Sequence, residues 1–437
     1  MSGIRDFNLT LGSKIVTLVV AIGTQSCLAW LLGPEGRGSY AVCIVFATLL
    51  NIIFAIGCDI ASLYFVSSGR FSISEGITHA LIYGGIASLL AITAGWILMQ
   101  LPLSFLDKAD PTAFYLALAL IPSSLFSLLF INLLTSVQRF DWFAIMLVVH
   151  GLGQLLFTVI FVWLFPWGVN GALLANIIRG LIVILSILFF FRWKYNLILV
   201  RPSIKTLWEM FHYGARYYAG KISGIMNFQV GTIMLAFFAT KEDVGLFAVA
   251  SQITVQAMVI PDALTTVLIP KVAGNKEGKR ELVAQCARLT GLICGMLLLI
   301  LAVFAKPIVV MLFSRAFLPA VPLIQILAVG VLIRCACKVF VPYLLGVDRP
   351  GIVSVSTAIG TIVTLVVLWL LLPVIGLPGA AIGTVTGSII SSTLLTIGFI
   401  QLSGLGVWEV WKLKWSDWMM VVNAASGVSQ KILSNYR

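Results

Sequence analysis

Residues 213–249 decide the fold, and they read YGARYYAGKISGIMNFQVGTIMLAFFATKEDVGLFAV. The pattern predicts an apolar helix to residue 238, a charged turn at 241–243, and a further helix that opens with Val244-Gly245-Leu246-Phe247-Ala248. A similar opening, Gly38-Ser39-Tyr40-Ala41-Val42, follows a short turn near the N-terminus. We therefore interpret the stretch as the start of a second copy of the first part of the chain.

Two pairs of matching segments indicate this duplication. Residues 38–42 fall on 245–249 after a shift of 207 positions, and residues 168–172 (GVNGA) fall on 376–380 (GLPGA) after a shift of 208. Each half holds six predicted spans, an even number, so the two halves share one orientation in the membrane. The expected relation between them is a pseudo-two-fold axis along the membrane normal.

The composition indicates an integral membrane protein. The chain is 60% hydrophobic and 10% charged, with a mean hydropathy of +1.08, and 437 residues cannot hide that much apolar surface from water. A spanning helix needs about 20 mainly apolar residues. Twelve such runs occur, at 12–32, 39–66, 80–101, 113–135, 143–165, 169–191, 210–238, 244–269, 287–305, 320–345, 352–372 and 377–401.

These features predict an all-α membrane protein with about twelve transmembrane helices in two six-helix lobes. We divide the chain into an N-terminal lobe (1–192), a cytoplasmic linker (193–209), a C-terminal lobe (210–403) and a cytoplasmic tail (404–437). In the tail, tryptophans recur along one helical stripe with lysines beside them, which is typical of an interfacial helix lying on the membrane. The residues concerned are Trp408, Trp411, Lys412, Lys414, Trp415 and Trp418.

The distribution of basic residues predicts the orientation. Most lysines and arginines between spans fall on the face that holds both termini, and that face is therefore predicted to be cytoplasmic. The net charge of +12 then reflects contact with anionic lipid and gives no reason to expect nucleic acid. The opposite face receives only Arg37, Lys108, Lys241, Lys306 and Arg315.

The short loops and the positions of the titratable residues disfavour several classes of function. The loops are short, the phosphate-binding pattern Gly-x-x-x-x-Gly-Lys-Ser/Thr is absent, and no catalytic His or acid pair is present, so we expect no enzyme. The cysteines fall in apolar runs and the histidines lie on different predicted helices. We expect no disulfide, metal site or cofactor.

Cations inside the spans are the strongest functional signal. An arginine near the bilayer centre is costly unless it faces a bundle interior or a hydrated cavity. Arg179 and Arg334 fall near mid-depth and are expected to face substrate, although pairing with a carboxylate is the alternative. Lys338 lies one turn from Arg334, so the two are expected to project toward one spot.

Three further cations lie near the predicted cytoplasmic ends of spans. Lys14 and Lys221 match each other in the repeat, and Arg216 lies close to Lys221. Such side chains commonly extend to lipid phosphates. Their repeated placement favours a shared cytoplasmic entrance that attracts an anion.

Two acids lie well inside spans. Asp59 and Asp262 are candidates for binding a coupling proton or sodium ion, and pairing with a lysine is the equal alternative. Pro261 is expected to kink the eighth span. Amides able to contact sugar hydroxyls, or to bond between helices, are Gln25, Asn51, Asn227, Gln229, Gln252 and Gln256.

Over residues 1 to about 402, the chain resembles the polysaccharide flippases of the multidrug, oligosaccharidyl-lipid and polysaccharide exporter superfamily. The resemblance rests on the six-plus-six arrangement, on LGPEGRGSYA at 32–41 with its counterpart at 244–248, and on Gly-x-x-Gly-Ala before the sixth and twelfth spans. It implies two lobes around a central cavity, lined chiefly by the first, second, seventh and eighth spans. It also implies transport of an undecaprenyl-pyrophosphate-linked oligosaccharide across the bacterial cytoplasmic (inner) membrane by alternating access.

The resemblance implies partners as well as roles for residues. Lys14, Arg216 and Lys221 are its pyrophosphate-binding candidates, whereas Arg179, Arg334 and Lys338 lie on spans that it places less centrally. The expected partners are the lipid-linked oligosaccharide, membrane lipids, a coupling H⁺ or Na⁺, and the polymerase and ligase of the same glycan pathway. The alternatives are an ion-coupled multidrug exporter of the same superfamily and a non-transporting component of a glycan assembly complex.

Overall fold

The computed structural model describes residues 2–412 except 138, 197, 273–278 and 348. Within these residues it describes the backbone alone, without side chains, at 2–11, 14–15, 140, 216–217, 219–228, 266–267 and 269–272. The first half forms α1 (Ser2–Ala55), α2 (Cys58–Ser67), α3 (Ile73–Met99), η1 (Ser104–Lys108), α4 (Pro111–Ser136), α5 (Phe140–Thr158), η2 (Val159–Leu164) and α6 (Gly168–Tyr195). The second half forms α7 (Ile204–Phe238), α8 (Lys241–Val255), η3 (Gln256–Met258), α9 (Val259–Val272), α10 (Lys279–Val303), α11 (Ala305–Phe313), η4 (Arg315–Ala320), α12 (Val321–Lys338), α13 (Val341–Gly346), α14 (Pro350–Ile375), α15 (Leu377–Ser403) and α16 (Val407–Trp411).

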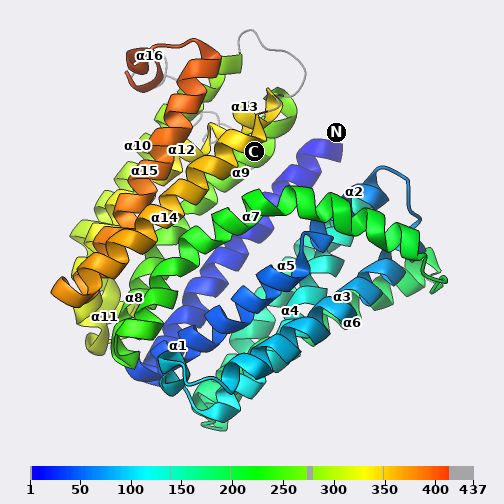
Figure 1. Cartoon of the computed structure of the whole chain (residues 1–437), viewed down its shortest axis with the longest axis horizontal. Coiled ribbons are helices and arrows are strands. Elements are labelled where there is room, and N and C mark those ends of the chain that lie inside the picture. Colours follow the sequence, from blue (N-terminus) through cyan, green and yellow to red (C-terminus); the bar gives the residue numbers. More distant parts are fainter. Residues whose placement is uncertain (1, 138, 197, 273–278, 348, 413–437) are drawn as a thin grey trace, which may run out of the picture.

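The helices form two lobes that meet at one end. In Figure 1 the lobes approach each other where α1 lies against α8, and they diverge toward the end that carries α2, α13 and α16. We call the first the closed end and the second the open end. The long helix α7 links the lobes, since it contacts α2 of the first lobe and α14 of the second.

The predicted number of spans agrees with the described helices. Within the described residues, ten helices are long and apolar enough to cross a membrane. One of them, Val16–Ala55, contains two spans, because Gly33 (φ 64°, ψ −179°) and Pro34 reverse the chain inside α1. Together with α7, this gives the predicted arrangement of about twelve helices in two lobes, which is confirmed.

The second span differs from its prediction. It was expected to be continuous over 39–66, but the helix breaks between α1 and α2, where Ile56 (φ 37°) and Gly57 (φ 69°) take left-handed backbone conformations. A Cβ on Gly57 would lie 2.6 Å from the carbonyl oxygen of Gly214 on α7. The break therefore brings the backbones of α2 and α7 together, and hydropathy alone gave no sign of it because both sides of the break are apolar.

The α-helix of the eighth span is interrupted just before Pro261, where a kink was predicted. The α-helical pattern gives way to the 3₁₀ turn η3 just before the proline, whose ring excludes the carbonyl four residues earlier from the usual helical bond. That carbonyl, on Ala257, instead accepts a bond from the thiol of Cys294 at 3.8 Å. The carbonyl group that Pro261 leaves without its helical bond thus has a partner on α10.

The tail begins as a docked helix and ends early. The guanidinium of Arg288 donates to the carbonyl oxygens of Glu409 (2.9 Å) and Val410 (3.2 Å), which fixes α16 against α10. The helix ends at Trp411, because Lys412 has extended backbone angles (φ −67°, ψ 117°). The predicted helical stripe therefore does not continue without interruption, and Lys414, Trp415 and Trp418 lie outside the described residues.

Close glycine packing between α14 and α15 gives a stability prediction. A Cβ on Gly387 would lie 1.8 Å from Oγ1 of Thr364 and 2.4 Å from the carbonyl oxygen of Gly360. Overpacking typically costs about 1–3 kcal/mol, so Gly387→Ala should lower the thermal unfolding midpoint of the detergent-solubilised protein. Gly351→Ala in α14 is the matched control, since nothing lies within 4 Å of its added Cβ. Equal midpoints for the two variants would contradict the close packing.

Candidate functional site

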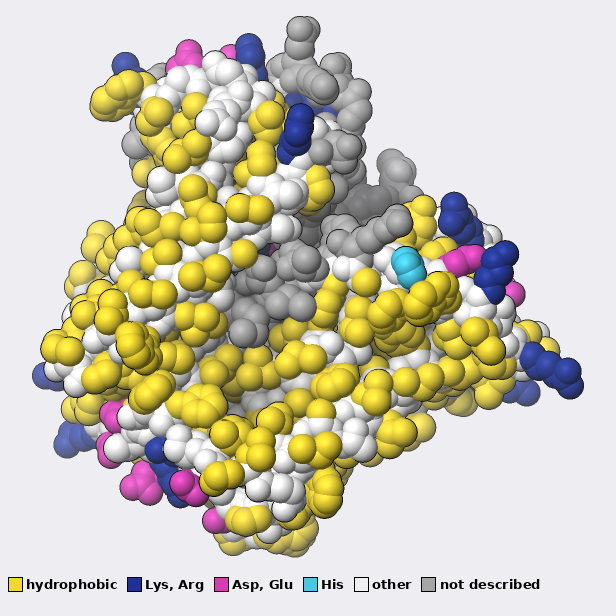
Figure 2. Space-filling model, viewed as in Figure 1, with side chains coloured by type: hydrophobic (Ala, Val, Ile, Leu, Met, Phe, Trp, Pro, Cys, Tyr) yellow, Lys and Arg dark blue, Asp and Glu magenta, His cyan; other side chains and the backbone are white. Residues whose placement is uncertain are grey.

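A cavity of about 470 Å³ lies between the two lobes, and we call it the central cavity. Its polar lining comes from α1, α7, α8, η3, α9 and α12. The residues concerned are Arg37, Tyr40, Gln229, Thr232, Ser251, Gln252, Gln256, Asp262 and Lys338. Figure 2 shows that the visible outer flanks of both lobes are mostly hydrophobic and that the visible charged side chains gather toward the ends of the molecule. The central cavity therefore brings polar and charged side chains, beside apolar ones, between two lobes whose visible flanks are apolar.

Arg37 is the residue that joins the lobes across this cavity. Its Nη2 donates to Oε1 of Gln25 in the first span and to Oε1 of Gln252 in α8, the latter at 2.6 Å. Its guanidinium also lies 5.3 Å from the ring centroid of Tyr40. The prediction that placed Arg37 on an external turn is wrong, because helix resumes directly after Gly33 and turns residue 37 into the seam between lobes.

Two nitrogen atoms of the Arg37 guanidinium donate no hydrogen bond to the described residues. The residue is 1% exposed, and its Nε and Nη1 have no hydrogen-bond partner among the described residues. The oxygens that it contacts belong to neutral amides, so they satisfy hydrogen bonds without balancing the charge. Buried cations of this kind are retained where an anion or water occupies the adjacent space. Arg37 can therefore bind an anion that enters the central cavity.

The opposite wall of the central cavity contains an ion pair. Lys338 on α12 pairs with Asp262 on α9, which is the structural alternative considered for that acid. Arg334 does not share the space: it lines a separate small cavity between α8, α12 and α15. The expectation that Lys338 and Arg334 project toward one spot stays a prediction, since Asp262 pairs with Lys338 and its charge also acts on Arg334.

Arg179 lies in a second cavity, inside the first lobe, and connects to Arg37 through a chain of contacts. Its Nη2 donates to Oδ1 of Asn176 at 3.1 Å, and Nδ2 of Asn176 donates to the hydroxyl of Tyr40 at 2.7 Å. Tyr40 in turn lies beside Arg37. This second cavity has a volume of about 420 Å³ and includes Asn51, Ser124, His150, Asn176, Arg179 and Tyr218.

The predicted amides lie in two cavities or, with several predicted cations, outside the described side chains. Gln229, Gln252 and Gln256 line the central cavity, and Gln25 reaches it through its bond to Arg37. Asn51 lines the second cavity and donates to Ser124 at 2.6 Å. The remaining sequence candidates, which lie outside the described side chains, are Lys14, Arg216, Lys221 and Asn227.

Asp59 lies apart from the central cavity. It is 3% exposed and belongs to the first turn of α2, directly after the break in the second span. A helix N-terminus stabilises a carboxylate, and Nδ2 of Asn132 donates to it at 3.5 Å. Asp59 and Asp262 therefore do not form one ion site. No group of three or more His, Cys, Asp and Glu in the described chain could hold a metal ion.

The closed end is formed by the two repeat-related glycines. A Cβ on Gly38 would lie 1.7 Å from the carbonyl oxygen of Lys241, and one on Gly245 would lie 2.0 Å from that of Pro34. Residues that correspond in the repeat thus meet at the seam, as a two-fold axis between them requires. Lys108 reinforces the contact by donating to the carbonyl oxygen of Ala239 at the end of α7, at 2.5 Å.

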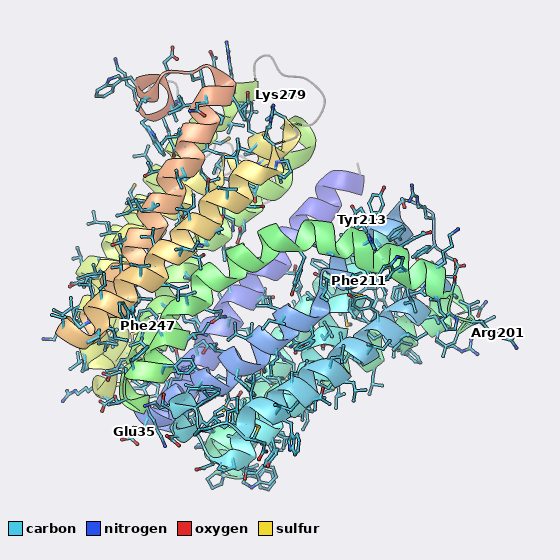
Figure 3. The ribbon with its side chains drawn as sticks, viewed as in Figure 1. Glu35, Arg201, Phe211, Tyr213, Phe247 and Lys279 are labelled. Carbon is cyan, nitrogen blue, oxygen red and sulfur yellow. The ribbon has the colours of Figure 1, made fainter. Side chains whose placement is uncertain are left out.

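The opposite ends of the lobes are far less constrained by each other. Figure 3 shows Lys279 at the tip of one lobe and Arg201 at the tip of the other, whereas Glu35 lies where the lobes meet. The seam between α1 and α8 therefore closes one end of the central cavity. The sequence signal that could have identified Arg37 is its place next to Gly38, the glycine that the repeat brings to this seam.

Comparison with known proteins agrees with this architecture. The family model described as "Polysaccharide biosynthesis protein" matches residues 4–276. The succinoglycan biosynthesis transport protein ExoT of Rhizobium meliloti (strain 1021) is 22% identical over 418 residues, which is 93% of this chain and 80% of the relative.

Two solved structures share the fold. The lipid II flippase MurJ, in an inward closed conformation, is similar with a TM-score of 0.70 and 13% identity, covering 90% of each chain. An inward-facing multidrug resistance MATE family transporter of the MOP superfamily is similar with a TM-score of 0.66 and 16% identity, covering 91% of this chain and 94% of the other.

Proposed function

Since this chain belongs to the polysaccharide biosynthesis protein family, we propose that it carries a lipid-linked oligosaccharide across the bacterial cytoplasmic membrane for the assembly of a surface polysaccharide. The carrier lipid in this proposal is undecaprenyl pyrophosphate. The similarity to a succinoglycan transport protein over most of both chains supports the assignment to glycan export.

The observation that carries the proposal is Arg37 at the closed end of the central cavity. A diphosphate that leaves water needs a fixed cation, because charge–charge attraction strengthens as the surrounding dielectric constant falls. Arg37 supplies two unpartnered N–H groups there, as far as the described residues go. The glutamines along the cavity offer hydrogen bonds to sugar hydroxyls, and the prenyl tail can stay in lipid between the lobes.

The charge of the central cavity favours an anionic substrate over an organic cation. Its described ionisable lining residues include Arg37, Lys338 and Asp262, and the last two pair with each other. The cation that remains is Arg37. An exporter of cationic drugs would be better served by an acidic cavity, so the multidrug alternative is the weaker one.

The mechanism in this proposal is alternating access. With both termini in the cytoplasm, the closed end faces outward and the open end faces the cytoplasm, which is the state expected to accept substrate. The lobes then rock about their contacts to release it on the other side. Asp59 and Asp262 remain the candidates for coupling this movement to H⁺ or Na⁺, and the polymerase and ligase of the glycan pathway remain the proposed partners.

Deletion of the gene tests this function directly. We expect surface polysaccharide to be lost and lipid-linked repeat units to accumulate in the cytoplasmic leaflet, where they remain protected from enzymes added outside. Expression of the wild-type chain should restore both. Unchanged surface glycan together with increased sensitivity to cationic drugs would instead identify a multidrug exporter.

A further inference from the structure

The cavity inside the first lobe is distinct from the central cavity. It lies between α1, α4, α5, α6 and α7, has a volume of about 420 Å³, and we call it the N-lobe cavity. Ile44 is the residue that both cavities share, and Arg37 does not reach this one. The proposed path of the oligosaccharide does not use it.

Arg179 brings a positive charge into this cavity without a balancing acid. Its Nη2 donates to Asn176 and its Nη1 lies 3.3 Å from Nδ1 of His150, and neither group is negative. The described lining contains no Asp or Glu, and no ion pair of Arg179 occurs among the described side chains. A guanidinium in such low-dielectric surroundings is costly unless a counter-charge accompanies it.

Two hydrogen-bond donors point to where that counter-charge would lie. Nε of Arg179 on α6 and the hydroxyl of Tyr218 on α7 are both buried, and neither donates a hydrogen bond within the part of the chain that the structure describes. The Tyr218 oxygen lies near the backbone of Ile56 and within reach of the charge of Asp59. Tyr218 is only 7% exposed. Both side chains line the N-lobe cavity, so unused donors from two helices converge on one space.

Asn51 can supply a third donor. Its Nδ2 donates to Ser124, while its Oδ1 has no partner in the described residues. The oxygen and nitrogen of an amide exchange places when the group rotates by half a turn. Ser124, which has one proton, would then donate to that oxygen in place of its present bond to the carbonyl oxygen of Leu120 (2.9 Å), and the amide N–H₂ would turn toward the cavity.

We propose that the N-lobe cavity is a binding site for a small inorganic anion of the size of chloride or phosphate, held by Arg179 and Tyr218. The anion neutralises the buried guanidinium and satisfies both donors. It also ties α7 at Tyr218 to the first lobe, while α7 also packs on α14 of the other lobe. Binding of an anion at this site therefore restrains the movement of α7, which links the two lobes.

Anion-dependent thermal stability of the purified full-length chain tests the site. Unfolding midpoints are measured in sodium chloride and in sodium phosphate against sodium gluconate at equal ionic strength, since a bulky organic anion does not fit. A ligand that binds only the folded state raises the midpoint. We expect chloride or phosphate to raise the wild-type midpoint, and Arg179→Gln to require at least about tenfold more anion for half the effect, equivalent to about 1.4 kcal/mol of binding.

Matched variants separate binding from damage to the fold. Tyr218→Phe removes only the hydroxyl and should weaken the anion effect, whereas Arg179→Lys keeps the charge and should retain part of it. Arg192→Gln, at an exposed position on the same helix, should behave as wild type.

Two outcomes would overturn the proposal. One is an equal anion shift in the wild type and in both Arg179→Gln and Tyr218→Phe, and the other is the absence of a shift with either anion. Neither of these outcomes affects the gene-deletion test of the proposed function, because anion binding is measured without transport.

Discussion

Replacing Gly38 with valine is expected to abolish transport by holding the lobes apart at their closed end. An added Cβ would lie 1.7 Å from the carbonyl oxygen of Lys241, and the symmetry-related change at Gly245 would place one 2.0 Å from the carbonyl oxygen of Pro34. Both obstacles are backbone atoms, which cannot rotate away as a side chain can. Because packed interiors resist such overlap, the lobes must separate.

Labelling from outside the cell measures this separation. Ser251→Cys, which lines the central cavity, serves as a reporter in a chain whose seven native cysteines have been replaced. A membrane-impermeant maleimide should reach it more readily in Gly38→Val than in the parent. Gly85→Val is the control, since that exposed glycine on α3 has nothing within 4 Å of an added Cβ. Unchanged labelling together with normal glycan export in Gly38→Val would show that this contact does not close the cavity.

Replacing Arg37 with glutamine is the second change with a large expected effect. It removes the unpaired cation of the central cavity and leaves the oxygens of Gln25 and Gln252 without their shared donor. An unsatisfied buried acceptor costs about 1–3 kcal/mol, and a diphosphate loses its counter-charge as well. We expect surface glycan to fall at least tenfold, as measured in the deletion strain carrying the variant. Arg315→Gln, at an exposed position on η4, should retain export.

The variant Gln252→Glu distinguishes an anion-binding role from a purely structural one. A carboxylate at this position would pair with Arg37 across the seam and strengthen the bridge between lobes. If Arg37 serves only as a bridge, Gln252→Glu should preserve export. If Arg37 binds the substrate diphosphate, the new carboxylate neutralises it, and export should fall as it does in Arg37→Gln.

Much of the fold was accessible from the sequence because each spanning helix must bury its backbone hydrogen bonds in about 20 apolar residues. Gly33 and Pro34 marked the reversal between the first two spans, and Pro261 marked the 3₁₀ interruption of the eighth. The break at Ile56–Gly57 was missed, since a glycine inside an apolar run signals flexibility without saying whether it is used.

The site was harder to predict because side-chain direction depends on packing between distant segments. Arg37 read as a loop residue, yet helix resumes early enough to bury it against Gln252. Lys338 and Arg334 share a helix and line neighbouring cavities, and the sequence did not show that Asp262, on another helix, pairs with Lys338. Lys14, Arg216 and Lys221 remain predictions.

The sequence by itself determined the membrane class, the number of helices and the repeat, because these follow from local composition and from spacing along one chain. The tertiary structure alone decided which charges lie together, since only the packing of one lobe against the other places Arg37 between Gln25 and Gln252. The tertiary structure also explains why glycine occurs at both repeat-related positions, 38 and 245. The two-fold relation between the halves brings Gly38 and Gly245 into backbone contact, where any larger side chain would force the lobes apart.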